Sequence, residues 1–196
     1  MDHDDHVRLL RAGVTVPGGT PPGGTWADIG AGTGAFTLAL GELLGAGSAI
    51  VAVDRDGSAL RENARAMAAR FPDVVLTMLI ADLTGSLRLP TLDGLVATNS
   101  LHFVARDRQV DVVRRLAGHL RPGGTFVVVE YDADRGNPWV PHPFSVAGWE
   151  RLAAAAGLTE VRLLTRVPSR FLGAIYCAVA QRPNDVTRTS RSDDST

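Results

Sequence analysis

The sequence predicts an α/β fold: a doubly wound, mostly parallel β-sheet with helices on both faces and an antiparallel C-terminal strand. From residue 26 onward, short apolar segments alternate with longer segments of helical periodicity, which is typical of a parallel sheet covered by helices. Near the end, only a short turn, Pro-Ser-Arg, separates two apolar segments. Parallel strands need a much longer crossover, so this last pair must be antiparallel.

The elements follow in order along the chain. Residues 3–12 form a predicted helix with Val7 and Leu10 facing inward, and the Gly/Pro-rich segment that follows is a linker because it suits neither helix nor central strand. The remaining strands and helices are assigned from the length and periodicity of their apolar patterns. We expect strands at 26–29, 49–53, 74–80, 92–98, 125–131, 161–167 and 171–180, and helices at 36–44, 57–70, 107–120 and 145–156. The helix at 107–120 is expected to stop at Arg-Pro-Gly-Gly.

Length and composition indicate one globular domain. The 196 residues suffice for one substantial core and are few for two. We expect an N-terminal helix and linker over 1–24, a domain over 25–182 and a disordered polar tail over 183–196. No apolar segment approaches the ~20 residues that span a bilayer, and the acidic N-terminus does not resemble a signal peptide. We therefore expect a cytoplasmic protein.

The charged residues exclude several kinds of chemistry. All 20 cationic side chains are arginines, so Schiff-base and P-loop lysines are excluded. The net charge is −1 and no basic block occurs, which disfavours a nucleic-acid partner. Cys177 lies in an apolar segment and is predicted to be a packed thiol. The cluster at 3–6 (His-Asp-Asp-His) is expected to be a solvated terminus, with no metal bound.

A glycine-rich loop follows the first predicted strand and is typical of a Rossmann-like nucleotide site. The stretch Asp28 to Ala35 has two interpretations. Gly30, Gly32 and Ala35 fit the turn that receives a dinucleotide pyrophosphate, whereas Gly30, Gly32 and Gly34 fit a loop that receives a nucleoside without phosphate. Asp54, at the end of the second strand, can bind the ribose hydroxyls of either ligand.

Two further carboxylates help to discriminate between these ligands. Asp28 precedes Gly30, where an anion beside a pyrophosphate is unfavourable and a ligand with an ammonium and a sulfonium would be stabilised. Asp82 follows the third strand directly, where a carboxylate and the adjacent N–H can bind the adenine edge. The alternative is that Asp82 only forms a turn before Thr-Gly.

Two later segments and the terminal hairpin complete the set of motifs. The segments are Asp-Gly-Leu-Val-Ala-Thr-Asn-Ser-Leu-His-Phe and Leu-Arg-Pro-Gly-Gly-Thr-Phe-Val-Val-Val-Glu. Together with the glycine loop and the carboxylates, they resemble the class I S-adenosylmethionine-dependent methyltransferases over residues 25–181. The chain is most similar to the small-molecule branch that includes the ubiquinone and menaquinone C-methyltransferases. The resemblance implies S-adenosylmethionine as cofactor and methyl transfer to a small organic acceptor. The alternatives are a non-catalytic cofactor-binding or partner-regulating module on this fold and an NAD(P)-dependent reductase.

The resemblance also implies roles for individual residues. Those that bind the cofactor are Gly30, Gly32 and Gly34 at its methionyl and ribose parts, Asp28 at its amino end, Asp54 at the ribose, Arg55 against the adenine, Asp82 and Leu83 at the adenine edge, and Asn99, whose carbonyl faces the methionyl amine.

The acceptor is expected beyond the carboxyl ends of the strands, near His102, Glu130, Tyr131 and the loop that follows. Methyl transfer from a sulfonium depends mainly on alignment, and a general base is needed only when the acceptor must lose a proton. His102 is the candidate base, and a structural histidine is the alternative. Trp139 and Phe144 are predicted either to stack on an aromatic or isoprenoid acceptor or to pack their own loop. Because the segment before the domain is short, we expect that either the acceptor is held shallowly or a second subunit or another protein completes the pocket, and a homodimer is one form of the latter.

Overall fold

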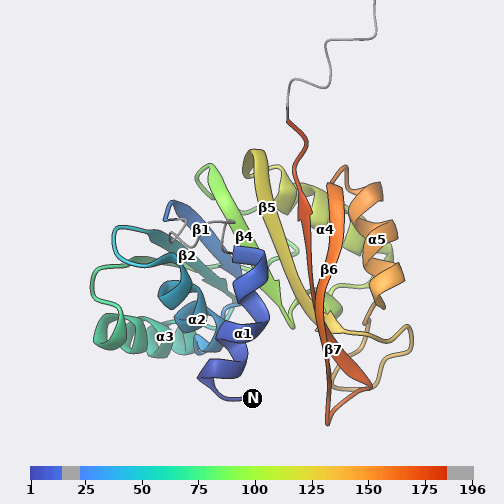
Figure 1. Cartoon of the computed structure of the whole chain (residues 1–196), viewed down its shortest axis with the longest axis horizontal. Helices are drawn as coiled ribbons and strands as arrows, with labels where there is room; N and C mark the ends of the chain where they lie inside the picture. Colours follow the sequence, from blue (N-terminus) through green and yellow to red (C-terminus); the bar gives the residue numbers. More distant parts are fainter. Residues whose placement is uncertain (15–22, 185–196) are drawn as a thin grey trace, which may run out of the picture.

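The computed structural model describes residues 1–14 and 23–184 and shows a seven-stranded sheet in the order β3-β2-β1-β4-β5-β7-β6 (Figure 1). The strands are β1 (Thr25–Ile29), β2 (Ala49–Asp54), β3 (Val75–Ile80), β4 (Leu92–Thr98), β5 (Leu120–Tyr131), β6 (Thr159–Pro168) and β7 (Ala174–Gln181). The helices are α1 (His3–Val14), α2 (Ala35–Leu44), α3 (Gly57–Arg70), α4 (Arg106–Ala117) and α5 (Val146–Ala155), with a short 3-10 helix η1 (Leu101–Phe103).

The predicted doubly wound sheet is confirmed. Strands β1 to β5 pair in parallel, whereas β7 pairs antiparallel with both β5 and β6. The hairpin therefore does not simply extend the sheet, because β7 is inserted between β5 and the edge strand β6. Its first residues lie beside the last residues of β5, with Ile175 opposite Tyr131.

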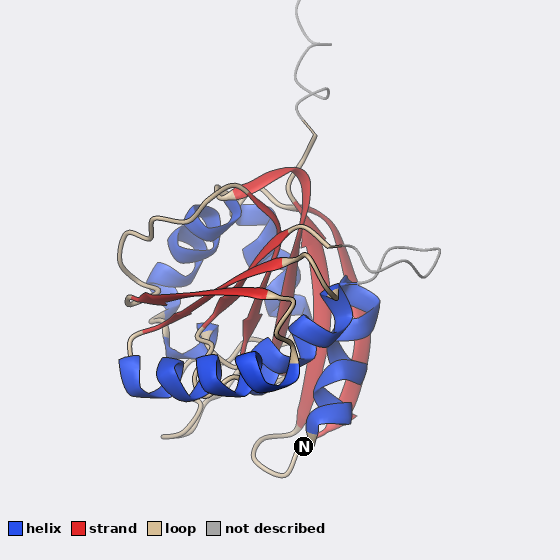
Figure 2. Cartoon of the chain, turned by 90° about the vertical axis from the view of Figure 1, so that its left-hand side faces the viewer, coloured by secondary structure: helices blue, strands red, loops and turns tan. Residues whose placement is uncertain are grey.

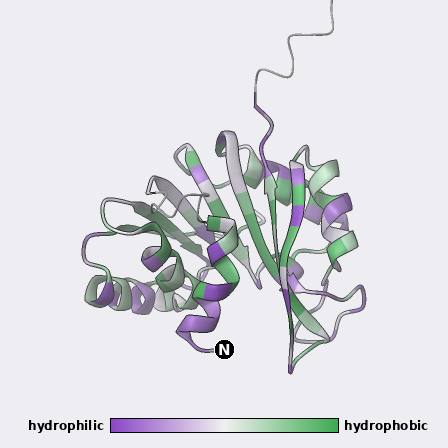
Figure 3. Cartoon of the chain, viewed as in Figure 1, coloured by the Kyte–Doolittle hydropathy of each residue, from purple (hydrophilic) through white to green (hydrophobic). Residues whose placement is uncertain are grey.

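Helices cover the two faces of the sheet in two layers (Figure 2). Strand residues alternate between the faces, as the two-residue period of a strand requires. Trp26 of β1 packs with α1, α2 and α3, and its neighbour Ala27 belongs to the core beneath α4 and α5. The central strands are accordingly hydrophobic, whereas α1 begins with hydrophilic residues (Figure 3).

Helix α1 extends two residues beyond the prediction of 3–12. It buries Val7, Leu9, Leu10 and Val14 against α2 and the sheet. His3 at its start pairs with Glu42 of α2 at 2.7 Å. The division into segments 1–24, 25–182 and 183–196 stays a prediction, since most of the linker and of the tail lies outside the described residues.

The Arg-Pro-Gly-Gly segment does not have its predicted role. Helix α4 ends earlier, at Ala117, and residues 121–124 belong to β5. They form a bulge, because Leu120 pairs with Leu92 and pairing with β4 resumes only at Thr125, opposite Gly94. A proline without an N–H and a glycine with φ of 73° suit such an irregularity in a strand.

Two segments are more exposed than their apolar sequences predict. Strand β3 is an edge strand, and Val75, Met78 and Ile80 are exposed because the connection from β3 to β4 contains no helix that could cover them. Phe171, which was expected in the last strand, lies in the turn between β6 and β7. Within the described ranges, no helix has the length and apolar character needed to cross a membrane.

Candidate active site

A cavity of ≈ 400 Å³ opens at the carboxyl ends of the central strands. The chain leaves β1 toward one face of the sheet and β4 toward the other, and ligands of doubly wound folds bind at such a switch point. Its volume lies within the range of about 300–1,000 Å³ found for small-molecule sites. Most of the predicted cofactor-binding residues line it: Gly30, Gly32, Asp54, Arg55, Asp82, Leu83 and Asn99.

The glycine loop passes close to the neighbouring backbone. The N–H groups of Gly30 and Ala31 donate to the carbonyl of Val53 at 2.8 and 3.0 Å. A Cβ on Gly30 would lie 2.5 Å from Cβ of Ser100, so no larger residue fits there. Gly32 has φ of 52°, and a Cβ on it would meet no protein atom within 4 Å. A side chain at Gly32 would thus enter open space at the wall of the cavity.

Asp54 connects the end of β2 to this loop. Its Oδ2 accepts a hydrogen bond from the N–H of Gly32 at 2.8 Å, and its Oδ1 accepts one from the N–H of Asp56 at 2.9 Å. Each carboxylate oxygen has two acceptor sites, so both can still accept from a pair of vicinal hydroxyls. The carboxylate is therefore held in one orientation while it retains the capacity to bind a ribose.

Asp82 forms the turn that was the alternative interpretation, and it also lines the cavity, so its binding of the adenine edge stays a prediction. Its Oδ1 accepts from the N–H and the hydroxyl of Thr84, both at 2.7 Å, which is the turn geometry expected before Thr-Gly. These hydrogen bonds lower the pKa of Asp82, with smaller contributions from Arg55 and Arg108. The turn uses only Oδ1, so Oδ2 remains at the cavity wall as an acceptor.

Asn99 has an uncommon backbone conformation at the centre of the site. Its φ is 49°, a left-handed value that is costly for a residue other than glycine. The N–H of Asn99 donates to the carbonyl of Val129 at 2.8 Å, which fixes the position. Its buried Oδ1 has no hydrogen-bond partner among the described residues. An unpaired acceptor of this kind is compatible with a donor supplied by a ligand.

Asp28 and Gly34 lie behind the loop and do not line the cavity. The hydroxyl of Thr37 in α2 donates to Oδ2 of Asp28 at 2.6 Å, and Nδ2 of Asn63 in α3 donates to that hydroxyl at 2.7 Å. Gly34 has φ of 98°, and a Cβ on it would overlap the side chain of Asn63. In this arrangement the two residues support the loop, and direct contact between Asp28 and the cofactor stays a prediction.

A second cavity of ≈ 260 Å³ adjoins the first, and Asn99 and Phe103 line both. We call it the acceptor-side cavity, because it lies among the residues near which the sequence predicts the acceptor. The other residues of its wall are His102, Tyr131, Trp139, Val140 and Phe171. Phe171 was missed in the sequence because an apolar residue beside a strand was assigned to that strand.

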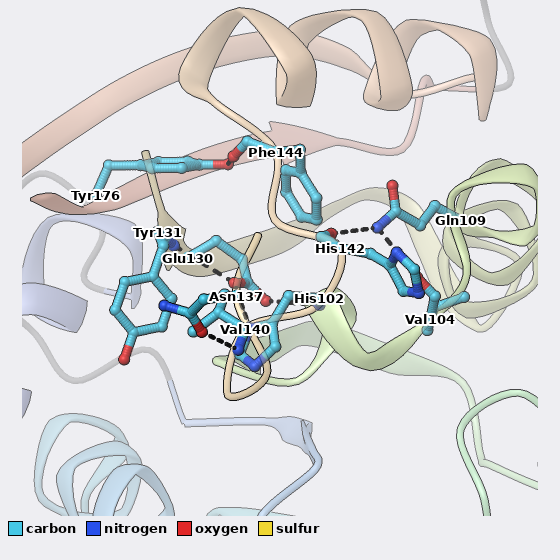
Figure 4. A network of polar contacts seen from close by, with 10 residues as sticks. All are labelled: His102, Val104, Gln109, Glu130, Tyr131, Asn137, Val140, His142, Phe144 and Tyr176. Atoms are coloured by element: carbon cyan, nitrogen blue, oxygen red, sulfur yellow. Dashed lines mark hydrogen bonds and ion pairs between the residues drawn. The ribbon is translucent and has the colours of Figure 1, made fainter. Parts of the chain in front are cut away.

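His102 forms a buried pair with Glu130 (Figure 4). Its Nδ1 lies 2.7 Å from Oε2 of Glu130, and the side chains are 3% and 0% exposed. Oε1 of Glu130 also accepts from the backbone N–H of His102 at 3.2 Å. When Glu130 is ionised, its carboxylate can only accept, so a neutral His102 in this pair carries its ring proton on Nδ1 and has Nε2 as an acceptor. Both residues were expected near the acceptor, but their pairing was not predicted.

Comparison with known proteins identifies the family. A family model described as "Methyltransferase domain" matches residues 27–126, just over half of the chain. The chain belongs to this methyltransferase family. Of the two interpretations of the glycine loop, the match supports the nucleoside site of S-adenosylmethionine, which is the cofactor of this methyltransferase. The match covers all the predicted cofactor residues. No relative was found among curated proteins.

Solved structures share the fold of the methyltransferase at low sequence identity. The 1,6-didemethyltoxoflavin-N1-methyltransferase of Burkholderia thailandensis has a TM-score of 0.71 and 21% identity, over 93% of this chain and 79% of that one. The YcgJ protein of Bacillus subtilis has a TM-score of 0.70 and 14% identity, over 93% of this chain and 100% of that one. Human N-acetylserotonin methyltransferase has a TM-score of 0.65 and 16% identity, over 94% of this chain and 52% of that one. The chain likewise spans 55% of the methyltransferase SibL.

Proposed function

We propose that this methyltransferase methylates a small organic acceptor bound in the acceptor-side cavity. The main support is that Asn99 and Phe103 line both cavities. A cofactor in the larger cavity and an acceptor in the smaller one would meet across this shared wall. Methyl transfer from a sulfonium requires in-line alignment of donor and acceptor, and two adjoining cavities can hold both in place.

The residues of the larger cavity suit S-adenosylmethionine in their chemistry. Asp54 would hold the ribose hydroxyls, and Asp82 with Leu83 would bind the adenine edge while Arg55 lies against the ring. Gly30 and Gly32 allow close approach of the backbone, and Asn99 offers acceptors at the methionyl end. When bound, the cofactor supplies a methyl group activated by its sulfonium.

His102 is proposed as the general base for this reaction. Glu130 orients the imidazole and compensates the positive charge that the ring gains when Nε2 accepts a proton. The pair is buried, so its mutual interaction is weakened little by solvent. This arrangement serves an acceptor that must lose a proton on methylation.

The class of acceptor, the branch of the family, the oligomeric state and the location in the cell stay proposals. The Burkholderia thailandensis structure contains bound 1,6-didemethyltoxoflavin and S-adenosylhomocysteine, which favours a small molecule as acceptor here too. Membership of the ubiquinone- and menaquinone-methyltransferase branch, pairing as a homodimer and location in the cytoplasm remain predictions from the sequence.

Isothermal titration with S-adenosylmethionine and S-adenosylhomocysteine tests the proposed cofactor site. We expect both to bind, and Asp54→Ala to weaken binding by about tenfold or more, because it removes charge-assisted hydrogen bonds worth about 1.5–3 kcal/mol. Asp73→Ala is the matched control, since this exposed aspartate precedes β3 and so lies at the amino ends of the strands, away from the cavity at their carboxyl ends. Absence of binding to the wild-type protein would overturn the proposal.

A further inference from the structure

The acceptor-side cavity carries an unusual concentration of exposed aromatic side chains. Phe103, Trp139 and Phe171 are 60%, 70% and 72% exposed, and all three line this cavity. No other phenylalanine, tyrosine or tryptophan among the described residues is exposed to this degree. They come from three separate connections, after β4, after β5 and between β6 and β7. Apolar groups gathered at one exposed place mark a binding site.

The loop that carries Trp139 is fixed by hydrogen bonds (Figure 4). Oδ1 of Asn137 accepts from the backbone N–H groups of Trp139 and Val140, both at 2.9 Å. Further along this loop, the side chain of Gln109 donates to the carbonyl of His142 at 2.8 Å, and the Tyr176 hydroxyl donates to the carbonyl of Phe144 at 3.3 Å. The loop therefore presents the indole from a defined backbone, which lowers the entropic cost of binding a ligand.

The wall of the cavity, in the part of the chain that the structure describes, lacks the carboxylate and guanidinium groups that usually pair with a charged ligand. Among the residues that the structure describes, the titratable side chains of this wall are those of His102 and Tyr131, and none is an arginine, aspartate or glutamate. Glu130 lies behind His102 and is fully buried. Burial and the neighbouring Glu130 raise the pKa of Tyr131, so its hydroxyl stays protonated and can donate a hydrogen bond. Burying an unpaired anion is costly, and the positive sulfonium of the cofactor would repel a cation, so the site favours neutral molecules.

The volume of the cavity and the basic nitrogen of His102 limit the range of possible acceptor molecules further. The volume of ≈ 260 Å³ is below the range of about 300–1,000 Å³ typical of sites for drug-sized ligands, which favours a compact molecule. Flat rings stack on aromatic side chains more effectively than saturated rings do. Nε2 of His102 can assist only an acceptor that has a proton to release.

We propose that the acceptor is a small, planar, uncharged aromatic or heteroaromatic molecule, methylated at a ring-bound O–H or ring N–H. This inference rests on the proposed function of the two cavities. The ring lies among Phe103, Trp139 and Phe171, with its O–H or N–H directed to His102. The acceptor oxygen or nitrogen bonds to the methyl carbon as the carbon–sulfur bond breaks, and the electron pair of that bond stays on sulfur. The acceptor's proton passes to Nε2 of His102.

Tryptophan fluorescence allows binding to be measured without turnover. The chain has three tryptophans, and Trp26 and Trp149 are buried. The full-length protein, saturated with S-adenosylhomocysteine, would be titrated with catechol and with indazole. The matched controls are vicinal cyclohexanediol, which has catechol's two hydroxyls on a non-planar ring, and protocatechuate, which adds a carboxylate to catechol. We expect catechol and indazole to quench the emission and the two controls to bind at least about tenfold more weakly.

Variants connect this binding to the aromatic side chains. Trp139→Ala and Phe171→Ala should each weaken catechol binding, measured by calorimetry, by about tenfold, because loss of an aromatic stacking partner costs about 1–3 kcal/mol. Trp139→Phe should retain most of the affinity. Leu163→Ala, which removes an exposed apolar side chain of β6 outside the cavity wall, should have no effect.

Turnover supplies the second measurement. With S-adenosylmethionine present, catechol and indazole should be methylated faster than cyclohexanediol and protocatechuate, and Glu130→Gln should lower kcat with little change in KM for catechol. If S-adenosylhomocysteine binds but neither planar probe binds, or if the controls match them, the inference on the acceptor is wrong while the cofactor site stands. If S-adenosylhomocysteine itself does not bind, the proposed function fails, and this inference with it.

Discussion

The hydroxyl of Thr37 donates a 2.6 Å hydrogen bond to Oδ2 of Asp28 in the closed space between β1 and α2. Oδ1 of Asp28 has no hydrogen-bond partner within the described residues. Burial raises the pKa of Asp28 to about 7 from its ordinary value of 3.8, although the bond from Thr37 acts in the opposite direction. A buried acid behind the cofactor loop thus titrates near neutrality.

This titration makes stability depend on pH. Between pH 3.8 and about 7 the folded protein keeps a proton on Asp28 that the unfolded chain has released. Raising the pH through this window therefore favours unfolding. At ~1.4 kcal/mol per pKa unit, the free energy of unfolding should fall by on the order of 2–3 kcal/mol from about pH 5 to about pH 8.

Urea unfolding at these two pH values measures the change in the free energy of unfolding. In Asp28→Asn this free energy should depend less on pH. The control is Asp82→Asn. Thr84 lowers the pKa of Asp82, so the stability that Asp82 contributes is lost only as the pH falls through its folded pKa, below the measured window. If the free energy of unfolding of Asp28→Asn still falls with pH as steeply as that of the wild-type protein, another group is responsible.

Arginines of α4 hold the loop that carries Asp82. Nη2 of Arg115 donates to the carbonyl of Thr84 at 2.8 Å, and Nη2 of Arg108 reaches the same carbonyl at 3.3 Å. Arg115→Ala should loosen this turn and weaken S-adenosylhomocysteine binding several-fold, since a hydrogen bond to a charged group contributes about 1.5–3 kcal/mol, reduced where solvent competes. Calorimetry is the measurement. Arg114→Ala is the control, because Arg114 bonds to Asp111 and to the carbonyl of Ala155. Equal affinities of the two variants would contradict the proposed support.

Alanine substitutions at three glycines with positive φ separate three effects: backbone strain, a steric clash in the core and loss of cofactor binding. Gly47 lies in a turn at the opposite edge of the sheet, with φ of 80° and open space around it, so Gly47→Ala measures backbone strain alone, about 1–2 kcal/mol. Gly34→Ala should be less stable than this, because the new Cβ meets Asn63. Gly32→Ala should match Gly47→Ala in stability but lose cofactor affinity. Thermal unfolding and calorimetry on the three variants check these expectations. A Gly34→Ala variant as stable as Gly47→Ala would refute the packing argument.

The fold was largely predictable because its signals are local. Alternating periodicities identified the strands and helices, and the short turn after Pro168 required an antiparallel pair. The position of β7 between β5 and β6 was not predictable, because it depends on which edge of the finished sheet receives the hairpin. The bulge at residues 121–124 was missed for a related reason: proline and glycine indicate an interruption, but only the partner strand shows that pairing resumes.

In the candidate site too, features with a local sequence signal were predictable and features that depend on tertiary packing were not. Glycines and carboxylates at strand ends were found because parallel strands bring their carboxyl ends to one edge. The pairing of His102 with Glu130 was also within reach, since His102 follows β4 and Glu130 lies near the end of the adjacent strand β5. The chain from Asp28 through Thr37 to Asn63 depends on side-chain packing between three elements. No sequence pattern specifies such contacts.

The reversed strand β7 determines where the turn between β6 and β7 lies. Because β7 runs against β5, the turn between β6 and β7 arrives at the edge where β4 and β5 end, and a parallel strand would have sent it to the opposite edge. The residues that line the proposed cofactor cavity all lie between Gly30 and Val104, within the region that the family model matches, whereas most of those that line the proposed acceptor cavity come after residue 126. The proposed acceptor cavity is thus lined largely by surface connections, which tolerate changes in length better than a core does. One chain can in this way keep a fixed methyl donor site while its choice of acceptor is adjusted separately.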